Sequence, residues 1–501
     1  MDVSSPYFIK KNKKANIKNK KNFDPDSEEE NEDEEKDSIS EIKNTSSKKR
    51  SNNLLSDESD DKYINKDIIP ANDRQLTTPL LKKVRKMKKK KISLSLVIFM
   101  VILPMGCKGV NPKSVSDKTG MSSQEEKTLI RKGNDFSLKL FQNIAENEQD
   151  KNVFISTIGM FYSLNIISNA ASGATQQEIC NALGIDTTAI KCINAFCRRQ
   201  ILSQALVTED QFLGPTSYMR TAALFQAGSS IDINKSFQDM LEQYYFGRVV
   251  KGDLDDAVQQ DINRWCNERT EGLINSFPIE KQDAQSANLL IANLFNGRWV
   301  QEFYKGYTKK EPFYNGTSAT VDMMNETNKE EVFTYAAMKD FSLLSIPYVG
   351  DYTLYVILPE KKNGLSAVLK SLDGERLRNA IFMLKPYDIV HVKLPKFEVS
   401  YSFKASDYLV SLGISKVFSN SAELDGVQTK PMKISDITQK TRIILDEDGT
   451  RAGAITSASF ITLSETMNPT EAYFYADHPF AYIIQDPFGN YCFMGTFWGY
   501  K

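Results

Sequence analysis

Few side chains in this 501-residue sequence have the types and spacing that catalysis requires. The two histidines are His391, in an alternating strand-like run, and His478, directly before a proline. Neither has metal-site spacing or an obvious nucleophile partner, and the sequence holds no glycine-rich phosphate loop and no Gly-x-Ser-x-Gly elbow. We therefore predict that the protein is not an enzyme and binds neither a metal nor another cofactor.

A different chemistry is indicated by residues 443–480, which begin as a β-branched strand, turn acidic and break at Gly449. Alternate side chains of a strand share one face. One face of the next segment would therefore hold only small or β-branched residues, namely Thr450, Ala452, Ala454, Thr456 and Ala458. Such a segment can enter a tight space between two strands, yet it has too little apolar surface to force itself into a core. The pattern predicts a strand held outside its sheet.

Separated motifs between about residues 125 and 501 resemble, in order, those of the serpin family. They lie at residues 152–156, 173–178, 293–299, 394–397, 412–418, 447–450, 476–480 and 493–495. The resemblance implies an α+β fold in which helices pack on large mixed or antiparallel β-sheets and a reactive-centre loop is exposed. The order of predicted elements, helices first and strands later, independently favours α+β.

The resemblance implies an inhibitor that acts as a suicide substrate. A target serine protease would cleave the loop within residues 446–480, and the freed hinge would insert as a new strand and trap the acyl-enzyme. The family's hinge maps onto Glu447, Gly449, Thr450, Ala452, Gly453 and Ala454. Counting along the hinge places the cleaved bond between Leu463 and Ser464, with Glu465 and Met467 as alternatives. A leucine there fits a chymotrypsin-like or subtilisin-like protease. The competing interpretation is a serpin-fold binding, carrier or chaperone protein that does not inhibit.

The resemblance also places Ser156, Trp299 and Gln439 in the region where the central sheet opens. This sequence departs from the family's pattern nearby. Thr157 replaces a usual proline, Gly159 a serine, Gln439 a histidine and Arg451 an acidic residue. Because Arg451 has the parity opposite to the small residues, we expect it to face solvent after insertion. The departures concern the control of sheet opening more than the fold.

Apolar periodicity predicts helices over 125–146, 158–171 (ended by Gly173), 237–245 and 255–275, the last with Trp265 on its apolar side. Strand-like runs lie at 221–225, 332–336, 342–346, 352–358 and 387–394.

Composition limits the partners and the redox chemistry. The net charge of −1 hides an acidic run at 24–37 and a basic run at 82–91, so no nucleic-acid partner is indicated.

After Cys107, five irregularly spaced cysteines favour free buried thiols, with a local bridge between Cys192 and Cys197 as the alternative. We expect a monomer whose partner is the target protease.

Three segments are expected along the chain: a charged, disordered extension over 1–86, which an over-extended gene model would explain; a signal peptide or signal anchor over 87–109; and a serpin domain over 125–501. Lysines 88–91 precede an apolar run at 92–105, then small residues. This is the layout of a signal peptide, and the run is short for a membrane span of roughly 20 residues. We expect a secreted domain, or a membrane-anchored one lying outside if 92–105 is not cleaved.

The export prediction is that mature protein begins between about Gly106 and Gly109, because signal peptidase cleaves after small residues that follow an apolar run. N-terminal sequencing of protein from its native source measures this. Residues 1–86 on secreted material would refute the signal peptide, and retention in membranes would favour the anchor.

Overall fold

The computed structural model describes residues 119–277, 279, 283–316, 319–328, 331–451 and 469–500. Its helices are α2 (Ser123–Asn147), α3 (Thr157–Ala170), α4 (Gly173–Leu183), α5 (Ile190–Gln204), α6 (Lys235–Tyr245), α7 (Asp256–Arg269), α8 (Leu365–Ser371), α9 (Gly374–Phe382) and α10 (Ser406–Ser411), with 3-10 turns η2 (Thr187–Ala189), η3 (Lys305–Tyr307) and η4 (Lys416–Phe418). Within these ranges no helix is both long enough and apolar enough to cross a membrane. The expected export segment, 87–109, lies outside the described residues.

Local sequence signals explain where the helices begin and end. Ser122 and Glu125 form a capping box at the start of α2, with main-chain to side-chain bonds of 3.3 and 2.6 Å. The expectation that Gly173 ends the second helix is wrong: the chain is already extended at residues 171–172, and Gly173 begins α4. Helix α7 is also shorter than expected, because Glu271 and Gly272 have φ of +50° and +77° and cannot continue a helix.

Three sheets and one hairpin carry the strands, so the predicted α+β class is confirmed. A six-stranded sheet has the order β14 (Phe397–Lys404), β15 (Lys433–Asp446), β16 (Gly449–Thr450), β6 (Ser286–Arg298), β4 (Tyr218–Ala227), β5 (Arg248–Lys251). A seven-stranded sheet has the order β1 (Val153–Ile155), β19 (Tyr491–Phe497), β18 (Phe480–Gln485), β11 (Thr353–Pro359), β10 (Phe341–Pro347), β9 (Thr334–Ala337), β12 (Lys385–Pro386). A four-stranded sheet has the order β17 (Glu471–Tyr475), β13 (Ile389–Pro395), β8 (Thr320–Asn328), β7 (Lys309–Pro312), and β2 (Glu209–Asp210) pairs with β3 (Gly214–Pro215).

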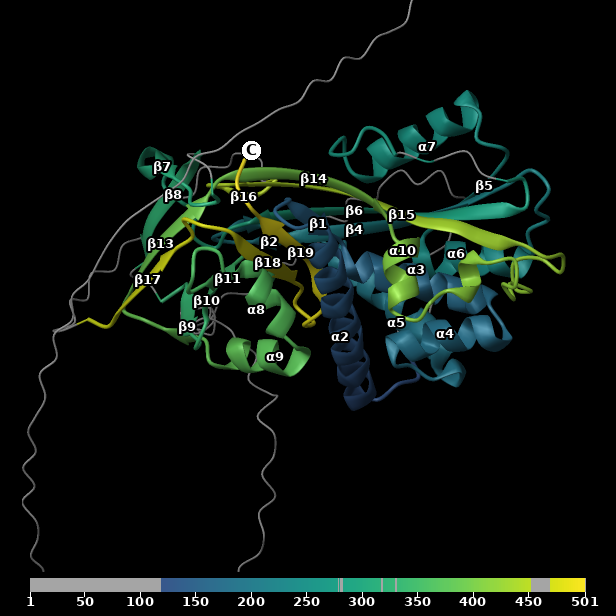
Figure 1. Cartoon of the computed structure of the whole chain (residues 1–501), viewed down its shortest axis with the longest axis horizontal. Helices are drawn as coiled ribbons and strands as arrows, with labels where there is room; N and C mark the ends of the chain where they lie inside the picture. Colours follow the sequence, from purple (N-terminus) through teal and green to yellow (C-terminus); the bar gives the residue numbers. More distant parts are fainter. Residues whose placement is uncertain are drawn as a thin grey trace, which may run out of the picture. The chain divides into compact units, whose positions relative to one another are not determined.

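Strand β6 is covered on both faces, which is why almost every one of its residues is buried. Leu289 and Ile291 enter the main core, on the side of α2 to α6, whereas Leu290 and Ala292 enter a smaller core beneath α7. Figure 1 shows α7 on one side of β4, β6 and β15 and the other large helices on the opposite side. A strand added next to β6 would therefore have packing partners on both faces.

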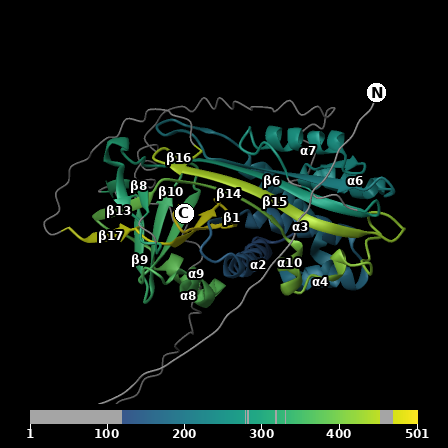
Figure 2. The ribbon, with the colours of Figure 1, turned by 45° about the horizontal axis from the view of Figure 1, so that its top comes forward.

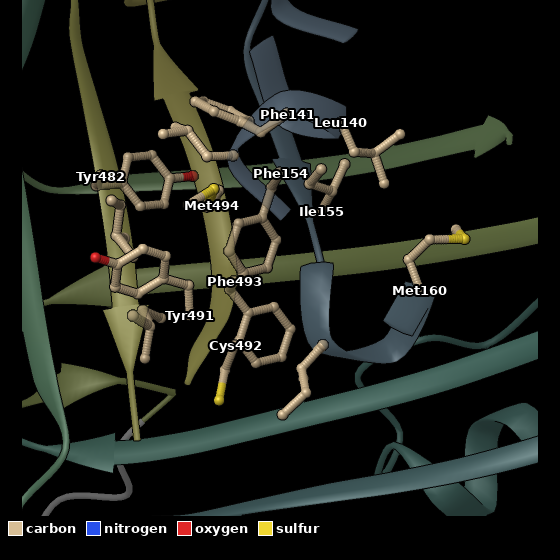
Figure 3. Close-up of a cluster of buried hydrophobic side chains, with 14 of the residues drawn as sticks. Leu140, Phe141, Phe154, Ile155, Met160, Tyr482, Tyr491, Cys492, Phe493 and Met494 are labelled. Carbon is tan, nitrogen blue, oxygen red and sulfur yellow. The ribbon is translucent and has the colours of Figure 1, made fainter. Parts of the chain in front are cut away.

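The main core fixes the start of α3 against the two C-terminal strands. Phe154 of β1 stacks on Phe493 of β19 with ring centroids 5.1 Å apart and lies 6.0 Å from Tyr482 of β18. Figure 3 shows these rings packed together with Ile155 and Met494. Because β1 runs directly into α3, this cluster holds Ser156, the N-cap of α3, close to the six-stranded sheet.

The six-stranded sheet has an incomplete seam between β6 and β15. These parallel strands pair from Ser286 and Lys433 up to Ala292 and Lys440, and no further pair joins them within the described residues. Strand β16 joins them again at the far end, where it is antiparallel to both. Figure 2 shows β16 at one end of the long β6 and β15. Residues 293–296 of β6 and 441–444 of β15 thus face one another without a shared ladder.

All five cysteines in the described part of the chain are free. Free thiols are confirmed, and the alternative bridge between Cys192 and Cys197 is wrong. Cys192 is partly exposed, whereas the other four are buried. Burial raises the pKa of the Cys266 thiol to about 12, despite the opposing charge of Lys440. This thiol therefore stays protonated and unreactive at neutral pH.

Candidate functional site

The candidate site is the entry to the seam, where β16 lies between β15 and β6. Gly449 pairs with Asp446 and Arg298, and Thr450 pairs with Leu445 and Gly297. A Cβ atom on Gly449 would lie 2.0 Å from the carbonyl oxygen of Gly297, and Gly449 has a φ of +149°. Only glycine fits this close approach.

Thr450 is already inside the sheet, with 2% of its surface exposed. Its hydroxyl lies 2.6 Å from the Tyr348 hydroxyl, and burial raises the pKa of that phenol, which remains neutral. The Tyr348 ring stacks on Trp299 at 4.2 Å. The expectation of a strand held wholly outside its sheet is therefore wrong for Gly449 and Thr450, because both neighbouring strands offer them main-chain partners. Thr450 nevertheless faces the interior of this structure.

Three residues just after β6, namely Trp299, Phe303 and Lys305, bind the acidic turn that precedes β16. Trp299 Nε1 donates to the carbonyl of Asp446 (2.9 Å). The Trp299 main-chain nitrogen donates to the carbonyl of Asp448 (3.2 Å). The Phe303 nitrogen donates to the Glu447 carbonyl at 2.9 Å, and Lys305 pairs with the Asp448 carboxylate at 2.8 Å. These bonds fix the position from which the hinge leaves the sheet.

Glu447 is the buried partner of an ion pair in this turn, and the other partner, Lys396, is partly exposed. The carboxylate accepts from Lys396 Nζ at 2.8 Å and from Thr308 Oγ1 at 2.8 Å, and the residue is 4% exposed. Burial alone raises the Glu447 pKa, but the hydrogen bonds from Lys396, the main chain and Thr308 outweigh it and leave the pKa below its ordinary value. Glu447 is therefore ionised at neutral pH, and its charge is balanced by Lys396.

Gln439 and Ser156 join β15 to the start of α3 lower in the seam. The Ser156 nitrogen donates to Gln439 Oε1 at 2.7 Å, and Gln439 Nε2 donates back to the Ser156 carbonyl at 2.9 Å. The Gln439 amide thus both accepts from and donates to the main chain of Ser156. An imidazole could not make both bonds to one residue, since its two nitrogens point in different directions.

The other departures near this pair have local explanations. Thr157 donates to the Tyr491 carbonyl at 2.5 Å, a bond that proline could not make. A Cβ at Gly159 would lie 2.3 Å from Asn293 Nδ2, so this glycine leaves room for the asparagine. Asn293 accepts from Thr221 at 2.9 Å, while its buried Nδ2 has no hydrogen-bond partner within the described residues. The seam therefore contains one unsatisfied donor on the main-core side.

Several predicted site residues cannot be placed. Ala452, Gly453, Ala454, Leu463, Ser464, Glu465 and Met467 lie outside the described residues. The structure brings Glu447, Gly449, Thr450 and Trp299 together at the entry, whereas Ser156 and Gln439 lie further along the seam.

Sequence reasoning missed Lys396 and Tyr348. Lys396 lies in the motif at 394–397, so pairing that motif with the acidic hinge would have found it. No sequence signal identifies Tyr348.

The two histidines make contacts of a structural kind. His478 contacts the Asp477 carboxylate at 2.7 Å and the Pro359 carbonyl at 2.8 Å. His391 stacks on Tyr473 at 4.6 Å on the four-stranded sheet.

Comparison with known proteins gives one consistent result. The family model described as "Serpin (serine protease inhibitor)" matches residues 131–499. Iripin-8 of Ixodes ricinus is 28% identical over 380 residues, covering 73% of this chain and 91% of the relative. Serine proteinase inhibitor 2 of variola virus is 27% identical over 366 residues, covering 72% of this chain and 98% of the viral protein.

Solved structures share the fold. Tengpin, a thermophilic serpin in its native state, aligns with a TM-score of 0.66 and 24% identity, covering 77% of this chain and 96% of tengpin. Human thyroxine-binding globulin in complex with thyroxine also aligns with a TM-score of 0.66 and 19% identity, covering 74% of this chain and 98% of the globulin.

The ion pair of Glu447 with Lys396 gives a prediction for stability. Glu447→Gln should lower the free energy of unfolding by about 1–3 kcal/mol at neutral pH, because the buried side chain loses its charge-assisted hydrogen bonds with Lys396 and Thr308. Since the Glu447 pKa is lowered on folding, its contribution is present above the unfolded value of about 4.3 and is lost as pH falls through the folded value. Urea unfolding of both proteins at pH 7 and pH 3.5 measures the difference, which should shrink in acid.

Asp322→Asn serves as the control. It removes an exposed partner of Lys310, 2.9 Å away, and should cost less than about 1 kcal/mol. Equal effects of the two substitutions, or a Glu447 effect independent of pH, would contradict the assignment.

Proposed function

We propose that this chain, which belongs to the serpin family, inhibits serine proteases as a suicide substrate. The single observation that carries the proposal is the start of a strand, β16, already seated between β15 and β6. A loop that continues from a seated strand needs only to extend in the same register to fill the seam.

The reaction would use the protease's own catalytic serine. Its Oγ would attack the carbonyl carbon of Leu463, the peptide bond to Ser464 would break, and the new amino group on Ser464 would leave with the proton that the catalytic histidine supplies. The product is an ester between Leu463 and the enzyme. Insertion of the freed hinge before water attacks this ester would carry the enzyme away. Loop insertion with release of strain is the known behaviour of serpins themselves.

The register of β16 supports insertion by small residues. Thr450 pairs with Gly297 and Leu445, so continuing the strand would place Ala452 opposite Phe295 and Ala454 opposite Asn293. Phe295 lies in the main core, and its ring is 5.1 Å from that of Tyr348. The space next to such bulky neighbours suits alanine better than a larger residue.

A protein that only carries a ligand on this fold is the second candidate. Thyroxine-binding globulin shares the fold, and its solved structure is a complex with thyroxine. At 19% identity that likeness concerns the fold alone. A carrier has no need of the small side chains at Ala452 and Ala454, which therefore favour inhibition. Secretion and a chymotrypsin-like or subtilisin-like target remain parts of the proposal.

Covalent trapping is the direct test, with chymotrypsin as the probe. Wild-type protein should give an SDS-stable complex. Thr450→Arg should give mainly nicked protein and active enzyme, because an unpaired arginine in place of a buried threonine costs on the order of 3–5 kcal/mol and displaces β16. Asn468→Arg is the control, since it adds the same charge beyond the proposed bond, on a part that insertion leaves outside. The gel ratio of complex to nicked protein is the measurement.

The test separates the two candidates. Nicked wild-type protein without complex would refute inhibition of chymotrypsin-like enzymes and favour the carrier. Equal complex from wild type and Thr450→Arg would refute the role of the hinge.

Loop cleavage should also stabilise the protein. Nicked protein should melt at a higher temperature than intact protein, because the inserted hinge adds a central strand with neighbours on both sides. Differential scanning calorimetry of both forms measures this. Equal midpoints would argue against insertion, whichever protease made the cut.

A further inference from the structure

A segment that follows α7 crosses the outer face of the seam. We call residues 270–277 the strap. On the β6 side, Leu273, Ile274 and Phe277 pack into the small core beneath α7. On the β15 side, Arg442 donates to the Leu273 carbonyl at 3.3 Å and Lys440 to the Ser276 hydroxyl at 3.3 Å. The strap thus spans the gap through which an inserting strand would pass.

Arg451 ties the hinge to the near end of the strap. Its Nη1 donates to the Thr270 carbonyl at 2.6 Å, and its Nη2 donates to the Glu271 carbonyl. Thr270 is the C-cap of α7, so these carbonyls lie at the negative end of that helix. A guanidinium can bond two carbonyls at once because its donors form a rigid fork.

The main chain at Arg451 turns out of the sheet. Its nitrogen donates to the Ile444 carbonyl at 2.8 Å and so extends the ladder by one bond, but its φ is +49°. An extended residue in an antiparallel strand would have a φ near −140°, and the rotation of about 170° between the two would swing Cβ to the other side of the N–Cα bond. The two carbonyl bonds therefore belong to the conformation before insertion, and Arg451 must release them to become part of a strand.

We propose that Arg451 is a positioning residue that latches the hinge to the strap and sets the threshold for insertion. The inference rests on the proposed function and adds its regulation. An acidic side chain, which the family usually has at this position, could not form the latch, since it has no donor for carbonyl oxygens when ionised. The expectation that Arg451 faces solvent concerns the state after insertion and stays a prediction; in this structure Arg451 contacts the strap.

The first test needs no protease. In hydrogen–deuterium exchange of the intact protein, Arg451→Ala should speed exchange in the peptide covering residues 449–451 and in the strap by roughly fivefold or more, because both sides lose a charged hydrogen-bond partner. Arg451→Lys should give a smaller increase, since an ammonium keeps the charge without the fork. Arg264→Ala is the control: it removes an exposed arginine of α7 that pairs with Asp261, away from the hinge, and should leave the hinge peptide unchanged.

The second test reads out the timing of insertion. With chymotrypsin, Arg451→Ala should raise the ratio of covalent complex to nicked protein, because an unlatched hinge competes better with hydrolysis of the ester. Arg264→Ala should leave this ratio unchanged.

The outcomes separate the latch from the proposed function. Unchanged exchange at the hinge in Arg451→Ala would overturn the latch even if wild type traps the enzyme. The same would follow if Arg264→Ala matched Arg451→Ala in both tests, since the effect would then be one of charge alone. Faster exchange in Arg451→Ala with no covalent complex from any variant would support the latch and refute inhibition of chymotrypsin-like enzymes.

Discussion

The close fit of Gly449 and Thr450 between two long strands is the contact on which the rest of the site depends. A side chain on Gly449 would collide with the Gly297 carbonyl, so only glycine fits where the hinge enters the sheet. The anchored turn before it sets the direction of entry, and the stacked Trp299 and Tyr348 support Thr450 from the interior. The hinge is therefore held by neighbouring strands and the strap from Gly449 to Arg451.

The two faces of the seam present different surroundings to an incoming strand. If β16 continued in its present register, even-numbered hinge residues would face the main core like Thr450, whereas odd-numbered residues would lie beneath α7 and the strap. In this register Ile455 would oppose Ala292, which is buried in the small core under α7. Its bulk, unusual for a hinge, then has an apolar neighbour, and the odd face is less open to solvent than strand alternation alone suggested.

Much of the fold and part of the site could be predicted from the sequence, because the signals involved are local. Apolar periodicity found α2 and α7, and strand alternation placed Thr450 toward the interior. The end of α3 was predicted to within one residue, but the role of Gly173 was not, because Ala171 and Ser172 are already extended and Gly173 begins the next helix. The seated β16 and the Tyr348 hydroxyl were missed for another reason: both depend on strands far apart in sequence, and no local pattern records which strands become neighbours.

The seam between β6 and β15 also has a consequence for the balance between closed and filled sheets. Along it the closed sheet is held by a parallel ladder, and parallel pairing is slightly weaker per residue than antiparallel pairing. A strand continuing from β16 is antiparallel to both neighbours, so filling the seam would exchange one ladder of the weaker kind for two of the stronger kind. The direction of the chain at Gly449 alone therefore biases the sheet toward the filled state, before any side chain is considered.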